Sequence, residues 1–94
     1  MTIPFSARLI AAEDVLMREL DGEAVLLNLA SETYFGLDEV GTRMWALVTS
    51  APSILAAYDM LLAEYAVAPG VLRDDMEAFL GQLLDHGLLE LRDG

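Results

Sequence analysis

A short aromatic segment, residues 34–37, leads with almost no loop into a helix that Asp38 can cap. Two apolar runs come just before it and are joined at Asp21-Gly22, a dipeptide that readily takes the positive φ angles of a two-residue hairpin turn. Because Tyr34 and Phe35 are strong strand residues, we expect a three-stranded antiparallel meander over residues 15–37. Its last strand would keep an edge of unpaired N–H and C=O groups beside the helix, and such an edge is a docking site.

Two helices are expected directly after the meander. Apolar residues recur at helical spacing after Asp38, where Gly41 allows close packing against a neighbour, and this first helix should end near Ser50. Ser53 supplies a fresh cap for a second amphipathic helix. We expect this second helix to end in the Val-Ala-Pro-Gly run at residues 67–70.

A third helix should begin at Val71 or Arg73, run to about His86 and stop at Gly87. Its apolar residues fall in an arc of roughly 140° on a helical wheel, which is wider than one packing seam needs; they are Leu72, Met76, Phe79, Leu80, Leu83 and Leu84. The margin of this arc, with Asp75 on one flank or Arg73 on the other, can stay open for a ligand. An ordinary broad core face would give the same periodicity.

Together these elements predict an α+β fold that is winged helix-turn-helix-like, with a three-stranded antiparallel β-meander followed by three α-helices. The 94 residues fit a single domain, and a hydrophobic content of 55% supplies ample material for a core. We divide this domain (1–94) into an N-terminal lead-in (1–13), the sheet (15–37) and a helical part (38–91) that closes with a short trailing segment.

The charge of the chain disfavours nucleic acid as a partner. Sixteen acidic residues face five arginines and no lysine, which gives a formal net charge of −11 that repels phosphate backbones. A winged-helix domain would place its third helix in the major groove of DNA, but here that helix would present four carboxylates with only Arg73 for balance: Asp74, Asp75, Glu77 and Asp85. The charge serves either solubility or the attraction of basic partners.

Composition also restricts the compartment. The chain has no cysteine, which excludes a disulfide framework and thiolate zinc sites and agrees with a reducing compartment. It shows neither a signal peptide nor an apolar run near the roughly 20 residues of a membrane span. We therefore expect a cytoplasmic protein that does not associate with membranes.

No pattern of catalytic residues is apparent. His86 is the only histidine, and the acidic pairs sit beside helix starts or turns, where carboxylates stabilise free N–H groups. A phosphate-binding glycine loop, a nucleophile elbow and a calcium loop are all missing from the sequence. We expect no enzyme activity, no catalytic residue, no cofactor and no metal site.

Two stretches, residues 21–29 (DGEAVLLNL) and residues 34–45 (YFGLDEVGTRMW), resemble the PqqD-like family. The C-terminal part resembles the last helix of that family through Asp75-Met76, Phe79-Leu80, Leu83 and the Gly87-Leu88-Leu89 run. The similarity is greatest to the stand-alone leader-binding proteins of lasso-peptide gene clusters. Members of this family are RiPP recognition elements, which bind the leader segment of a ribosomally made precursor peptide. The resemblance implies a non-catalytic leader-peptide-recognition domain, in which the leader adds a fourth strand between the third strand and the third helix.

The resemblance also implies a site and partners. It assigns the leader groove to five residues of the strand segment and five of the helix: Glu32, Thr33, Tyr34, Phe35 and Gly36, with Asp75, Met76, Phe79, Leu80 and Leu83. Aromatic and apolar leader residues would fill the pocket, with Asp75 as the polar contact. The partners it implies are the precursor leader, a separate leader peptidase and the cyclase that follows. A free edge further predicts that copies can pair as a homodimer when no peptide is bound.

Two alternative functions stay open from the sequence. The first is a winged-helix DNA-binding or regulatory domain that uses the same face. The second is a PqqD-type chaperone for a radical maturation enzyme, in which the groove is the same and the downstream enzyme differs.

Overall fold

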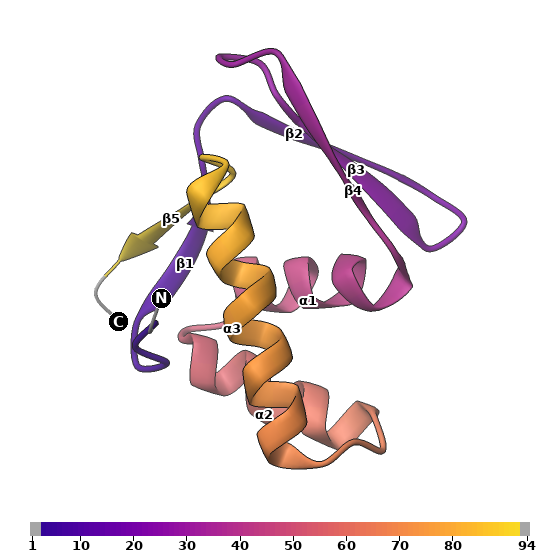
Figure 1. Ribbon diagram of the computed structural model, residues 1–94, viewed down its shortest axis with the longest axis vertical. Coiled ribbons are helices and arrows are strands. Elements are labelled where there is room, and N and C mark those ends of the chain that lie inside the picture. The colour runs from indigo at the N-terminus through magenta and orange to yellow at the C-terminus, as the bar shows by residue number, and fades with distance from the viewer. Residues whose placement is uncertain (1–2, 93–94) are drawn as a thin grey trace.

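The computed structural model describes residues 3–92. This part of the chain forms five strands and three helices in the order β1, β2, β3, β4, α1, α2, α3, β5 (Figure 1). Their bounds are Arg8–Ala11 (β1), Val15–Leu20 (β2), Glu23–Asn28 (β3), Thr33–Leu37 (β4), Glu39–Ser50 (α1), Ile54–Glu64 (α2), Pro69–Asp85 (α3) and Leu89–Arg92 (β5). The architecture is α+β, and the predicted meander followed by three helices is confirmed.

Strands β2, β3 and β4 form the meander, with β3 at its centre. Both residues of its first turn, Asp21 and Gly22, have positive φ angles of 54° and 84°, as the hairpin prediction requires. The second turn is held by Asn28, whose Oδ1 accepts hydrogen bonds from the amides of Ala30 at 3.0 Å and Ser31 at 3.2 Å. The first turn therefore depends on residues that accept positive φ angles, and the second on a side-chain hydrogen-bond acceptor.

Side-chain capping starts the first two helices where the sequence predicts. Oδ1 of Asp38 accepts from the Gly41 amide at 2.7 Å at the start of α1, and Oγ of Ser53 accepts from the Ala56 amide at 3.1 Å at the start of α2. Each bond satisfies one of the amide groups that the first turn of a helix leaves without a partner.

The predicted start of α3 is wrong by one half-turn or more. The helix begins at Pro69 instead of Val71 or Arg73, and α2 already ends at Glu64. Proline suits the first position of a helix because its missing N–H would have no partner there. The C-terminal stop is confirmed: Gly87 has a φ of 69°, and the Leu88 amide donates to the Leu83 carbonyl at 2.9 Å.

A second, two-stranded sheet was not predicted. The lead-in contains β1, which pairs antiparallel with β5, with Leu9 opposite Leu91 and Ala11 opposite Leu89. The trailing segment is therefore a strand. Residues from both sheets and all three helices share one core, in which Leu26, Ile54, Leu61 and Leu80 have no exposed surface. Figure 1 shows the pair of β1 and β5 on one side of α3 and the meander near the C-terminal end of that helix.

Candidate functional site

Strand β4 forms one edge of the meander. Its one side pairs with β3, where Phe35 lies opposite Leu26 and Tyr34 opposite Leu27. Within residues 3–92 no strand pairs with its other side. Backbone N–H and C=O groups on this free edge can therefore accept a partner strand.

A cleft of about 420 Å³ lies beside this edge, between β4, the first turns of α1, and α3. Phe35 and Phe79 give it aromatic walls, and its remaining lining is Gly36, Asp38, Val40, Gly41, Met44, Asp75, Ala78 and Gln82. The lining includes two carboxylates and no basic side chain. The cleft thus offers apolar contact together with hydrogen-bond acceptors.

Helix α3 presents two adjacent stripes of side chains. Leu72, Met76, Leu80 and Leu83 form the stripe that packs into the core, and all are at most 5% exposed. The neighbouring stripe runs along the cleft through Asp75, Phe79 and Gln82. The broad apolar arc therefore serves both the core and an open surface, since Phe79 is only partly buried.

The structure brings four of the ten predicted site residues into the cleft: Phe35, Gly36, Asp75 and Phe79. Glu32, Thr33 and Tyr34 are exposed and lie before the cleft on the turn and the start of β4. Met76, Leu80 and Leu83 are fully buried beneath it, so they support its wall from the core. That these ten residues contact a leader peptide stays a prediction.

Six residues that line the cleft were not predicted from the sequence to belong to the site: Asp38, Val40, Gly41, Met44, Ala78 and Gln82. Asp38 and Gly41 were recognised as a cap and a close-packing position, and both roles hold. The spacing of Asp75, Ala78, Phe79 and Gln82 was the available signal for a second stripe on α3.

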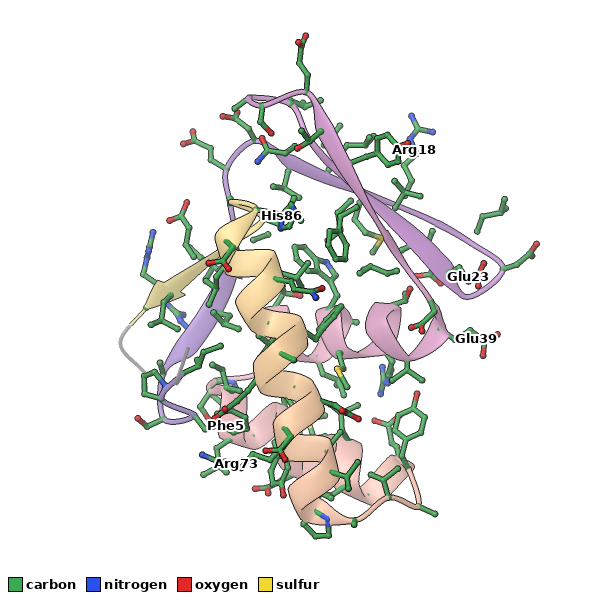
Figure 2. All side chains as sticks on the ribbon, viewed as in Figure 1. Phe5, Arg18, Glu23, Glu39, Arg73 and His86 are labelled. Atoms are coloured by element: carbon green, nitrogen blue, oxygen red, sulfur yellow. The ribbon has the colours of Figure 1, made fainter. Side chains whose placement is uncertain are left out.

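His86 lies at the C-terminal end of α3, where Figure 2 labels it. Its ring packs edge-on against Phe35, with ring centroids 5.4 Å apart and planes at 71°. Its Nδ1 lies 2.8 Å from the Gln82 carbonyl oxygen. These contacts fix the Phe35 ring, which forms a wall of the cleft, relative to α3.

A second exposed surface lies on the opposite face of the meander. Pairing places Leu16, Leu27 and Tyr34 in one row across the three strands, with Val25 and Leu20 beside them. Leu16 is 50% exposed, Leu20 78% and Tyr34 76%. This group of five residues is named the outer face, and it shares its side of the sheet with Arg18, opposite Val25, and Glu23, opposite Leu20.

The region from residue 3 to residue 92 contains no cluster of three or more histidine, aspartate or glutamate residues able to hold a metal ion. No helix in the same region is both long and apolar enough to cross a bilayer.

Comparison with known proteins gives a family and two similar structures. Residues 23–89 match the family model described as coenzyme PQQ synthesis protein D (PqqD). TbiB1 in complex with the TbiA(beta) leader peptide is 37% identical, with a TM-score of 0.81 over 86% of this chain and 94% of that chain. A lasso peptide synthetase B1 complexed with the leader peptide has the same fold, with 20% identity and a TM-score of 0.80 over 89% of this chain and 99% of that one. A comparison with curated proteins returned no significant match.

Proposed function

The chain belongs to the PqqD family of RiPP recognition elements, and from this premise we propose that it is a non-catalytic adaptor of lasso-peptide biosynthesis that binds a precursor leader peptide. The observation that carries the proposal is the free edge of β4 beside a cleft of about 420 Å³. The similarity to TbiB1, whose structure holds a leader peptide, supports the same ligand class.

The proposed binding mode is strand addition. The leader pairs with the free edge of β4, and its backbone hydrogen bonds supply affinity with little demand on sequence. Alternate side chains of an added strand point to the same face, so every second leader residue enters the cleft against α3. Selectivity then comes from the cleft.

The cleft suits an apolar or aromatic leader side chain. Phe35 and Phe79 provide the contact area, and burial of a large apolar side chain between them contributes about 1.5–3 kcal/mol. Asp75, at the rim on α3, is the proposed polar contact. Its exposed carboxylate accepts hydrogen bonds and can pair with a donor on the leader.

We assign the outer face to the processing enzyme, a separate leader peptidase, with the cyclase as the later user of the precursor. Leader binding occupies the edge of β4 and leaves Leu16, Leu20 and Val25 exposed on the other side of the sheet. One side of the sheet can therefore hold the leader while the other contacts an enzyme. This separation of the two surfaces supports an adaptor role.

A titration tests the proposal. We expect a synthetic peptide covering the leader encoded beside this gene to bind one-to-one by calorimetry, and a scrambled peptide of the same composition, which keeps the backbone but not the side-chain order, to bind at least about tenfold more weakly. Absence of binding by the native leader would contradict the proposed function. Genes adjacent to this one distinguish a lasso peptidase from a radical maturation enzyme as the downstream partner.

The surface of α3 argues against the DNA-binding alternative. Asp74, Glu77 and Asp85 line a shallow depression on this helix, which gives it negative charge where a recognition helix needs to approach phosphates. We expect no shift of a DNA fragment in a gel at low salt, a condition under which even non-specific DNA binders form complexes.

A further inference from the structure

The N-terminal segment, residues 3–11, precedes the part of the chain that matches the family model, which begins at residue 23. Ile3, Phe5 and Leu9 are at most 5% exposed and belong to the core. The carbonyls of Phe5 and Ala7 also accept hydrogen bonds at 2.8 Å from the first two amides of α2. The segment is thus packed against the helices, and its backbone is bonded to the start of α2.

Phe5 connects α2 to α3. Its ring packs edge-on against Tyr58 of α2, with centroids 5.9 Å apart, and the guanidinium carbon of Arg73 lies 4.1 Å from its centroid (Figure 2). The Tyr58 hydroxyl donates to the carbonyl of Pro69, the first residue of α3, at 3.0 Å. We name these four residues, Phe5, Tyr58, Pro69 and Arg73, the aromatic clasp.

The clasp acts where α3 has no cap of its own. Asp38 and Ser53 cap α1 and α2 with side-chain hydrogen bonds, whereas Ala68 at the start of α3 makes none. The contacts of Tyr58 and Arg73 therefore hold the first turn and a half of α3 in place. A cation over an aromatic face contributes a directional attraction as well as packing.

The first turns of α3 also carry part of the cleft. Arg73 and Asp75 are separated by about 200° around the helix, so they face opposite sides. Arg73 contacts the clasp, while Asp75 lines the cleft, followed one turn later by Phe79. Because a helix moves as a rigid element, rotation or tilt of α3 at the clasp would shift both cleft residues relative to β4.

We propose that Phe5 and Arg73 are positioning residues for leader binding, which set the rotation of α3 and hence the width of the cleft. This inference rests on the proposed function and adds to it a role for the N-terminal segment. Neither residue lines the cleft, so their effect on affinity is exerted through Asp75 and Phe79.

Two variants break the clasp in different ways. Arg73→Ala removes the cation, and Phe5→Leu removes the ring while leaving an apolar side chain in the core. We expect each to weaken binding of the fluorescein-labelled leader by about three- to fivefold in anisotropy titrations, close to the upper limit set by the strength of a cation–aromatic contact that involves an exposed arginine. Arg73→Lys keeps the cation and should stay within about twofold of the native protein.

Arg43→Ala is the matched control, since it also removes one arginine. Arg43 pairs with Glu64 on the surface between α1 and α2, away from the cleft, so leader affinity should not change. Amide hydrogen exchange of residues 72–79 supplies a readout that needs no leader, and it should be faster in both clasp variants than in Arg43→Ala.

The outcomes separate positioning from stability alone. If both clasp variants melt at lower temperature but bind the leader as tightly as the native protein when folded, the positioning role is wrong. Unchanged amide hydrogen exchange of residues 72–79 would overturn it as well. A native protein that binds no leader would instead contradict the proposed function.

Discussion

The ring of Phe79 on α3 lies directly against Gly41 on α1. A Cβ added to Gly41 would come within 3.4 Å of two ring carbons, Cε1 and Cζ, and within 3.2 Å of Oδ1 of Asp38. The glycine thus lets the aromatic wall of the cleft sit close to the first helix. A side chain at residue 41 would therefore contact both the carboxylate that caps α1 and the Phe79 ring, and the carboxylate is the closer of the two.

Gly41→Ala should weaken leader binding several-fold while changing stability little. The added methyl group crowds Oδ1 of Asp38 and touches the Phe79 ring, so these neighbours must shift by a few tenths of an ångström. Alanine favours a helix over glycine by about 1 kcal/mol, which offsets this cost. Gly81→Ala on α3 is the control, because a Cβ there meets nothing within 4 Å. We expect this control to raise the melting temperature without altering affinity. If both variants bind the leader with equal affinity, Gly41 does not determine the shape of the cleft.

Asn28→Ala should lower the free energy of unfolding by about 1–3 kcal/mol, because it leaves buried polar groups without partners. Asn28 is 8% exposed, and its side chain bonds the turn after β3 and, through Nδ2, the Gly87 carbonyl at 3.3 Å. Urea unfolding followed by circular dichroism measures the change. Ser31→Ala in the same turn is exposed and should cost less than about 0.5 kcal/mol. A similar loss in both variants would contradict this role of Asn28.

The sequence predicts those features of the structure that neighbouring residues determine, and it does not predict those that depend on contacts between distant parts of the chain. The turn at Asp21-Gly22 and the caps Asp38 and Ser53 follow from chemistry within a few residues, and all three are confirmed. The pairing of β1 with β5 joins the two ends of the chain through strands of four residues each, and its stability comes from tertiary packing. Periodicity over so few residues carries too little signal to predict it.

The candidate site shows the same division. Helical spacing identified an apolar arc on α3, but it could not tell which residues of the arc are buried and which line the cleft. In the structure the core covers Met76 and Leu80, while Phe79 is only partly buried. That division depends on where β4 and α1 lie against the helix. Gly41 was recognised as a close-packing position, but its partner Phe79 comes from another helix and only the structure identifies it.

The part of the outer face on β2 and β3 should act in processing and not in leader binding. Leu16→Glu places a charge on β2, on the far side of the sheet from the cleft, so leader affinity should stay within about twofold. The same variant should reduce cleavage of the precursor by the peptidase encoded in the same cluster at least fivefold, because a charge disrupts an apolar contact. Leu55→Glu on α2 is the matched control, since Leu55 is 46% exposed and Leu16 50%. Normal cleavage with Leu16→Glu would exclude the outer face as the enzyme contact.

Self-association should compete with the leader for the edge of β4. In the absence of peptide this free edge can pair with the same strand of a second copy. We expect a concentration-dependent dimer in size-exclusion chromatography with light scattering, and a one-to-one complex once leader is added. If the number of protein copies in the particle is the same with and without the leader, the edge of β4 does not mediate pairing between copies.

Phe79→Asp tests whether the leader binds between β4 and α3. A carboxylate in place of the ring removes an aromatic wall and adds charge beside Asp75, so calorimetric titration with the leader should show affinity reduced by more than about tenfold, or 1.4 kcal/mol. Leu84→Asp, at a partly buried position of the same helix that does not line the cleft, controls for destabilisation, with circular dichroism confirming that both variants are folded. Affinity lost only in Phe79→Asp is the predicted result, and native affinity in that folded variant would contradict the assignment of the cleft.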